Sequence, residues 1–230
     1  MKPLKFAGVL FIFAGVVCIG AGGFVVVSAQ VGLNSLNAVY RAQGVMMEYD
    51  ARGNFIDRGT VEGGNAILKL LTEDWQYPLK KSSLNPKDPL VNTPDELMVT
   101  YARINYHVLH GTQNITLDED VTYNGEVFEA GEHTFNIDGR YWNDFDRNHP
   151  LEGPARELAW TATAHGLLAN LAAGTATHSL VILTLFVGCL TIGFGVLFFL
   201  GGIAFFSAGH MKKKNVTVSR KRSVAVRKKK

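Results

Sequence analysis

Two long apolar runs without a charged side chain constrain this chain more than any other feature. They cover residues 6–29 and 180–208 and contain no Lys, Arg, Asp, Glu or His. Because a helix rises about 1.5 Å per residue, each run is long enough to cross a hydrocarbon layer of about 30 Å. The sequence therefore predicts a membrane protein with two transmembrane α-helices, at 6–29 and 180–208.

The charges predict how these helices are oriented. Twelve of the 23 Lys and Arg lie in residues 1–5 and 209–230, whereas all 20 Asp and Glu lie in residues 30–179, which thus carry a formal charge of −9. Positively charged flanks stay on the cytoplasmic side. We therefore expect a multi-pass protein of the cell membrane with a cytoplasmic N-terminus at 1–5, an extracytoplasmic domain at 30–179 and a basic cytoplasmic tail at 209–230.

A cleaved signal peptide is the rival interpretation of the first run. Val27-Ser28-Ala29 resembles the small-residue pattern before a cleavage site, which would fall after Ala29. However, the uncharged run has 24 residues, whereas the apolar part of a signal peptide usually has about 7 to 15. This length favours an uncleaved anchor. The two cysteines, Cys18 and Cys189, lie inside the runs, so the outer domain has to fold without a disulfide.

The outer domain has the pattern of an α+β fold. Short β-prone pieces at 45–49 and 54–57 predict a hairpin, and Asn124-Gly125 predicts a second one between 121–123 and 127–128. Asn65 is the predicted N-cap of a helix that continues to Trp75, and three prolines make 77–92 a loop.

Two further helices complete the outer domain. Thr93-Pro94-Asp95-Glu96 has the pattern of a capping box and predicts a helix over 94–110, with Leu97, Tyr101, Ile104 and Val108 facing inward. Pro154 opens a last helix that leads into the second run, along which small residues recur about every four positions.

Two histidines are the candidate metal ligands. His107 and His110 stand three positions apart, so they share one helical face and could bind the same ion. Arg103 lies one turn before His107 and opposes a cation there. A third ligand would have to come from His133, His149 or a carboxylate, since no spacing identifies one. A polar face that bonds to the rest of the domain explains the same pattern, and we expect no cofactor.

An aromatic and charged segment is the candidate interaction site. It contains Tyr141, Trp142 and Phe145, flanked by Arg140 and Arg147. Aromatic residues and Arg are enriched at binding hot spots, so this segment is expected to contact a partner. Asp144, Asp146 and Asn148 copy the start of a calcium loop, but the later ligand positions do not match. Asn114-Ile115-Thr116 fits a glycosylation acceptor in a eukaryotic secretory pathway.

The runs and the tail suggest contacts with lipid. Neither run carries an ionisable group, which argues against a transporter core. Small residues four apart, Thr184 with Gly188, Cys189 with Gly193 and Thr191 with Gly195, permit close helix packing. The tail can bind anionic lipid and is expected to bind no specific nucleic acid. Its candidate membrane-surface residues are Lys212, Lys213, Lys214, Arg220, Lys221 and Arg222.

Parts of the chain resemble small actinobacterial two-span membrane proteins of uncharacterised function. The resemblance lies in residues 8–15 and 26–30 and in His165-Gly166-Leu167-Leu168 before the second run. Many of these proteins are labelled aromatic ring-opening dioxygenases. That label implies an iron site, often of two His and one carboxylate, and the sequence shows no such set.

Three functions follow from these patterns. The first is a non-catalytic accessory protein of the cell envelope, whose acidic outer domain meets a membrane or envelope protein or a second copy of the chain. The second is a membrane-anchored, metal-dependent enzyme that uses His107 and His110. The third is a homo-oligomeric pore, which the uncharged runs disfavour.

Overall fold

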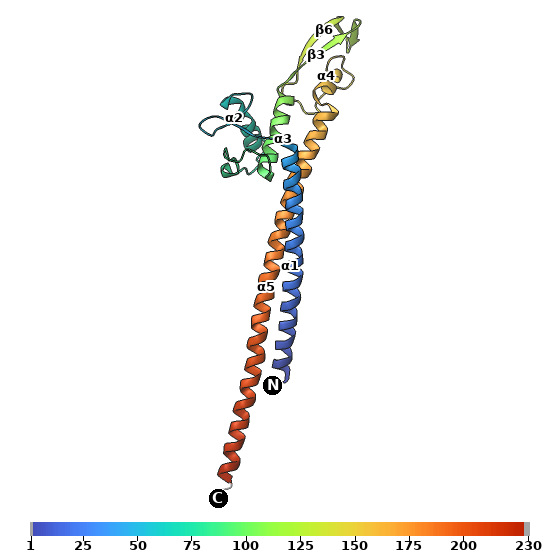
Figure 1. The fold of residues 1–230 in the computed structure, drawn as a ribbon. Coiled ribbons are helices and arrows are strands. Elements are labelled where there is room, and N and C mark those ends of the chain that lie inside the picture. The colour runs from blue at the N-terminus through green and yellow to red at the C-terminus, as the bar shows by residue number, and fades with distance from the viewer. Residues whose placement is uncertain (1, 228–230) are drawn as a thin grey trace. The chain divides into compact units, whose positions relative to one another are not determined.

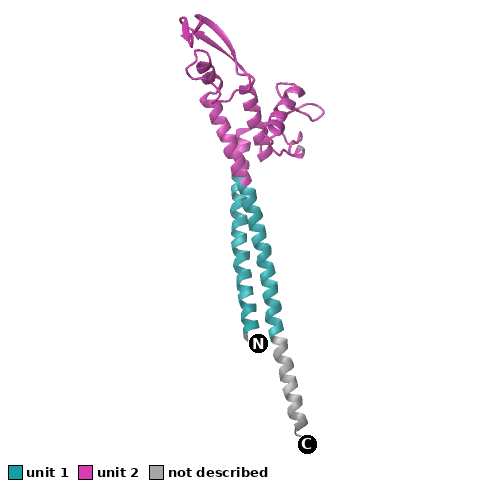
Figure 2. Ribbon diagram, turned by 180° about the vertical axis from the view of Figure 1, so that it is seen from behind, with its two compact units in different colours: residues 1–35, 180–230 teal, residues 36–179 magenta. Residues whose placement is uncertain are grey.

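The computed structural model describes residues 2–227, without the side chains of Lys2, Lys81 and residues 210–227. The chain divides into two compact units, shown in Figure 2. Unit 1 comprises Met1–Ser35 and Leu180–Lys230, and unit 2 comprises Leu36–Ser179. Unit 2 therefore covers nearly the same residues as the predicted outer domain.

Two helices run through the two predicted spans, α1 (Lys2–Gln43) and α5 (Ala162–Arg227). Both are long and apolar enough to cross a membrane, and in each only 11% of the most apolar window is buried. Large side chains such as Phe13 and Phe24 are 67% and 74% exposed. Residues 30–43 continue α1 beyond the first predicted span.

A seam of glycines packs the two helix segments of unit 1 against each other. The segments lie side by side and antiparallel in Figure 1, with Gly8 near Gly202 and Gly15 near Gly195. A Cβ placed on Gly15 would lie 2.7 Å from the Gly195 carbonyl oxygen and 2.6 Å from the Phe199 backbone nitrogen, one turn further along α5. Glycine is required here because the backbones themselves touch. The seam glycines are Gly8, Gly15, Gly22, Gly188, Gly195 and Gly202.

These glycines recur every seven residues in both helices, the spacing that keeps one stripe of a helix facing its partner in a left-handed pair. The small-residue pairs expected at a spacing of four are therefore only half correct. Gly188 and Gly195 lie in the seam, whereas a Cβ on Gly193 would meet nothing within 4 Å, and Cys189 is exposed.

After the end of α1, unit 2 continues with the predicted first hairpin and a helix that starts earlier than expected. β1 (Glu48–Tyr49) and β2 (Phe55–Ile56) pair antiparallel. Helix α2 (Val61–Lys69) is capped by Thr60, whose hydroxyl accepts the Gly63 N–H at 3.1 Å, so the prediction of Asn65 as the cap is wrong.

Glycine is tolerated in the first turns of α2 because the helix packs directly on β2. A Cβ on Gly64 would lie 2.3 Å from the Phe55 carbonyl oxygen. The helix then widens into the π-turn η1 (Leu70–Asp74), which ends at Trp75. The following loop contains one short 3₁₀ turn, η2 (Lys81–Ser83).

Helix α3 (Pro94–Leu109) confirms the predicted capping box. The Thr93 hydroxyl accepts the Glu96 N–H at 3.3 Å, and the Glu96 carboxylate accepts the Thr93 N–H at 3.0 Å. Glu96 is only 3% exposed, and burial raises its pKa although these N–H groups act in the opposite direction. Nearby, Tyr77 donates to Asp95 at 2.9 Å, and burial together with this bond raises the pKa of Tyr77 to about 12.

The buried face of α3 differs from the predicted stripe. Of the four residues expected inside, only Leu97 is fully buried, whereas Tyr101, Ile104 and Val108 are half-buried. The helix is shared by two apolar clusters, so its buried residues spread around it. One cluster contains Leu97 and Phe55 and the other contains Leu109 and Phe145.

Two nested hairpins follow α3. β3 (Thr112–Leu117) pairs antiparallel with β6 (Gly131–Asn136), and β4 (Val121–Tyr123) pairs with β5 (Glu126–Phe128) between them. The predicted Asn124-Gly125 turn is confirmed, since both residues have positive φ, at 50° and 87°. The outer pair was not predicted.

The last predicted outer helix is two helices. α4 (Glu152–Ala159) ends at Trp160, whose φ of −96° and ψ of 62° are not helical. The hydroxyl of Thr161 accepts the Ala164 N–H at 3.1 Å and caps α5. The expectation of one continuous helix from Pro154 is therefore wrong, because a bend at residues 160–161 separates it into two.

Candidate functional site

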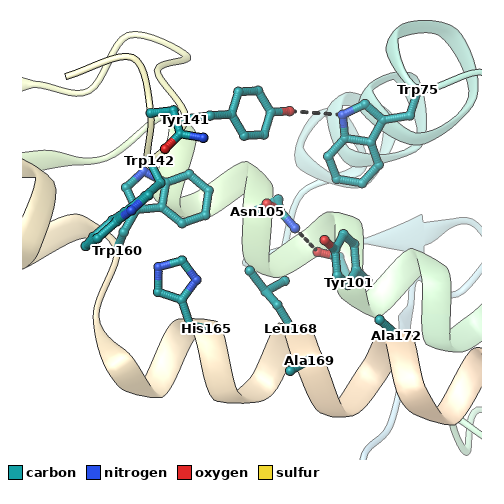
Figure 3. Close-up of a pocket in the computed structure, with 11 residues that line it drawn as sticks. Trp75, Tyr101, Asn105, Tyr141, Trp142, Trp160, His165, Leu168, Ala169 and Ala172 are labelled. Atoms are coloured by element: carbon teal, nitrogen blue, oxygen red, sulfur yellow. Dashed lines mark hydrogen bonds between the residues drawn. The ribbon is translucent and has the colours of Figure 1, made fainter.

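An aromatic pocket of about 630 Å³ in unit 2 is the first candidate site, and Figure 3 shows it. All three tryptophans of the chain line it. Its lining residues are Trp75, Tyr101, Asn105, Tyr141, Trp142, Asn143, Trp160, His165, Leu168, Ala169 and Ala172. Its volume falls in the range of about 300–1,000 Å³ that is usual for small-molecule sites.

Four separate segments bring these residues together. Trp75 follows the π-turn, Tyr101 and Asn105 come from α3, Trp142 from the loop after β6, and Trp160 from the bend between α4 and α5. In Figure 3, the Trp75 and Tyr101 rings lie on one side, the Trp142 and Trp160 rings on the other, and Asn105 between them.

Ring contacts fix the walls of this aromatic pocket. The Trp75 indole N–H donates to the Tyr141 hydroxyl at 3.0 Å, which joins the two sides. Trp160 stacks on Tyr141 with centroids 6.0 Å apart and on His165 at 5.7 Å. Trp142 meets His165 edge-on at 5.2 Å. Tyr141, Trp160 and His165 thus hold one another, whereas Trp142 has an edge-on contact with His165 as its ring contact within the pocket.

Hydrogen bonds hold the loop that carries Trp142. The Asp144 carboxylate accepts the Tyr141 N–H at 2.8 Å, and the Trp160 indole donates to the Arg140 carbonyl at 3.3 Å. Tyr141 nevertheless stays 40% exposed. The pocket thus offers flat apolar faces together with the neutral polar groups of Tyr141, Asn105 and Asn143. It can hold a ring whose faces are apolar and whose edge bears hydrogen-bonding groups.

The predicted interaction residues lie in different environments. Tyr141 and Trp142 line the pocket, whereas Phe145 is only 6% exposed and belongs to the core, so its predicted place on the surface is wrong. Arg140 lies over the Phe145 ring at 4.9 Å and pairs with Glu152 at 2.9 Å. It acts as a structural residue. Arg147 is exposed outside the pocket lining.

The sequence analysis singled out neither the lining residues Trp75 and Trp160 nor Arg156, which contacts the pocket residue Trp142. Arg156 is 7% exposed, and its Nε and Nη1 atoms are buried without a hydrogen-bond partner. Its guanidinium lies 3.9 Å from the centroid of the Trp142 ring. Trp142 thus lines the pocket and also covers a buried cation.

A second site surrounds Asp57, which is buried at 2% exposure. Its two carboxylate oxygens bind Arg103 Nε at 2.6 Å and His107 Nε2 at 2.9 Å. His107 borders a polar cavity of about 450 Å³ that Arg58 and His110 also line. The predicted polar face of α3 therefore consists of an Arg103–Asp57 ion pair and a His107–Asp57 contact, which tie the helix to the first hairpin.

The other three candidate histidines each contact a different partner. His110 Nδ1 lies 2.9 Å from the Tyr106 carbonyl, and His133 Nε2 lies 2.8 Å from the Glu129 carbonyl. His149 Nδ1 accepts the N–H groups of Leu151 and Glu152. In the part of the chain that the structure describes, no three His, Cys, Asp or Glu residues gather in a way that could hold a metal ion.

A third cavity, of about 610 Å³, is an apolar groove lined by the end of α1, by α3 and by the start of α5. Val39 and Leu167 are among its half-exposed residues. The side chains of the predicted membrane-surface residues, Lys212–Lys214 and Arg220–Arg222, lie outside the described residues.

Comparison of the chain with protein-family models, with curated proteins and with solved structures found no match. The resemblance to actinobacterial two-span proteins therefore stays a prediction.

Proposed function

We propose that this chain is a non-catalytic, membrane-anchored interaction protein of the cell envelope, which holds a group of its partner in the aromatic pocket. The observation that carries the proposal is the meeting of all three tryptophans around one cavity in which Tyr141 remains 40% exposed. Tryptophan and tyrosine dominate binding hot spots because they bury a large rigid surface at little conformational cost. A ring that served only the core would be covered, as Trp160 is at 4% exposure, whereas Tyr141 is not.

The proposed topology places both ends of the chain in the cytoplasm and unit 2 outside. Two observations support it. The apolar side chains of unit 1 are mostly exposed, as expected of helices solvated by lipid. The basic residues gather beyond the two spans, while residues 30–179 carry a charge of −9.

The partner proposal is tested by replacing pocket residues in the full-length protein. Trp142→Ala and Tyr141→Ala remove two walls, and Val127→Ala is the control, since Val127 is 58% exposed on β5 away from the pocket. Proteins recovered after cross-linking and solubilisation in mild detergent are compared by mass spectrometry. We expect a partner that wild type and Val127→Ala recover equally and that both pocket variants lose. Equal recovery by all four proteins contradicts the proposal.

The topology is tested separately with protease added to intact cells or spheroplasts. The proposal requires cleavage within residues 36–179 and protection of an epitope after residue 209. Protection of the middle and loss of the C-terminal epitope would reverse the orientation.

The second candidate is the membrane-anchored, metal-dependent enzyme. It is favoured by the hydrogen bonds of His107 in α3 and of His110 at its C-cap, because metal-ligating His usually gives its other ring N–H to an oxygen. His107 does so to Asp57 and His110 to the Tyr106 carbonyl, and both border the same cavity. Stoichiometric metal in the purified chain, lost on His107→Ala, would favour this candidate over the first.

A further inference from the structure

Arg156 stands apart from the other partly or fully buried arginines of unit 2. Arg103 is paired with Asp57 at 2.6 Å and Arg140 with Glu152 at 2.9 Å. Arg156 has only a 3.5 Å approach to Glu157, whose side chain is 72% exposed, and two of its nitrogens are buried without an acceptor. A buried cation without acceptors is costly, so an acceptor that reached it would be bound strongly.

Trp142 connects this cation to the aromatic pocket. The guanidinium covers a face of the Trp142 ring at 3.9 Å, and the same residue lines the pocket beside His165. A face of the ring is therefore already occupied by a positive charge, which disfavours a cationic ligand at this wall. None of the described residues that line the pocket is an Asp or Glu. The site is thus electrostatically suited to a negative group.

Trp142 is also placed to move. It lies in the loop between β6 and α4, outside any helix or strand, and is half-buried. Rotation of its side chain would give up the ring contact with Arg156 and uncover the guanidinium that lies against the ring. An anionic group there would replace one cation–π contact with charge-assisted hydrogen bonds, which are stronger.

We infer that the aromatic pocket binds a sugar residue that carries an anionic group, and that Arg156, uncovered by Trp142, pairs with this group. The inference rests on the proposed function and specifies its ligand. A pyranose ring has apolar C–H faces that fit the indole walls and hydroxyl edges that fit Asn105 and Asn143. A carboxylate or a phosphate would supply the two oxygens that a guanidinium binds.

The test uses the full chain in detergent micelles and the fluorescence of its three tryptophans, all of which line the pocket. The probes are glucose, glucuronate and glucose 6-phosphate, titrated into wild type, Arg156→Met and Arg52→Met. Arg52 lies in the exposed first hairpin turn, so its variant removes the same charge from unit 2 without touching the pocket.

We expect wild type and Arg52→Met to bind at least one acidic sugar about tenfold or more tightly than glucose. Arg156→Met should bind the acidic sugar no better than glucose, with its glucose affinity unchanged. A preference for glucuronate alone identifies a carboxylate ligand, and a preference for glucose 6-phosphate alone identifies a phosphate. Near-UV circular dichroism checks that Arg156→Met is folded, and Arg156→Gln replaces it if it is not.

Equal binding of the three sugars by wild type, or an acid preference that survives in Arg156→Met, overturns the inference. So does the absence of any sugar binding. If the partner is still lost on Trp142→Ala, these results contradict the sugar-binding inference alone and leave the proposed function intact. If the pocket variants recover the partner as well as wild type does, both the inference and the proposed function are contradicted.

Discussion

Replacing Gly15 by Ala should pull the two helices of unit 1 apart. The added Cβ would lie 2.6 Å from the Phe199 nitrogen, 2.7 Å from the Gly195 carbonyl oxygen and 2.9 Å from the Phe199 Cα. Ordinary contact begins at 3.4 Å, so the helices must separate by about 0.8 Å at this point. Every obstructing atom belongs to the backbone, and no side chain can rotate away.

The separation is not confined to one position. The seam glycines on either side, Gly8 and Gly22, also face backbone oxygens with only 2.8 Å for a Cβ, so the whole seam loosens. Overpacking of a close contact costs about 1–3 kcal/mol, and we expect the upper half of this range. Gly20→Ala is the matched control, because a Cβ there meets nothing within 4 Å.

The assay is a titration with SDS of the protein in mild detergent. Energy transfer is measured between dyes on cysteines at positions 35 and 180, after Cys18 and Cys189 are replaced by Ala. Gly15→Ala should lose transfer at a lower SDS fraction than wild type, by about 2–3 kcal/mol in the derived free energy. Gly20→Ala should match wild type or be slightly more stable. Equal midpoints for Gly15→Ala and Gly20→Ala would refute a backbone contact at the seam.

Three further predictions concern unit 2. Burial raises the pKa of Glu96, so the folded state binds its proton more tightly and loses stability as pH rises from about 4.3 through the raised value. Glu96→Gln can keep the capping box, so its free energy of unfolding in urea should increase relative to that of wild type as pH rises over this range. A difference that does not change with pH would contradict this. Asp57→Ala leaves Arg103 and His107 without their carboxylate and should lower the free energy of unfolding by about 3 kcal/mol. Glu48→Ala, at an exposed partner of Arg103, should lower it by less than about 1 kcal/mol. Urea unfolding midpoints measure both losses, and equal losses would count against a buried network. Arg156→Met removes two buried nitrogens that lack an acceptor, which is worth about 1–3 kcal/mol, and loses a cation–π contact of about 0.5–2 kcal/mol. The variant should therefore unfold at the same temperature as wild type or at a higher one, and a large loss of stability would show that Arg156 is already satisfied.

The features that the sequence predicted correctly depend on neighbouring residues. Thr93 and Glu96 need only each other to close a capping box, and Asn124-Gly125 needs only its own two positive φ angles. The apolar runs are also local, because length and the lack of charge are enough to identify them. The start of α2 was misplaced because two glycines obscured it, and their reason, the β2 backbone behind Gly64, lies outside the helix.

The candidate site could be predicted only in part. Tyr141 and Trp142 were identified because they are adjacent in an aromatic segment, but Trp75 and Trp160 come from other segments and carry no local signal of a shared pocket. Arg156 has an ordinary place in a helix, and its missing acceptor is a property of the packed domain. The seven-residue spacing of the seam glycines, in contrast, is present in the sequence and would have been found by a search for heptads.

Exposed aromatic residues have different physical consequences in the two units. In lipid, an exposed ring costs nothing, so Phe13 and Phe24, at 67% and 74% exposure, need no partner beyond the bilayer. In water, an exposed ring lacks the stabilisation that it would gain if it were buried. Tyr141 remains 40% exposed although it lies beside Trp160 and Trp75 in a domain that has no disulfide to stabilise it. The exposed rings of unit 1 therefore need only a membrane as their explanation, whereas the exposure of Tyr141 in unit 2 fits the proposed ligand.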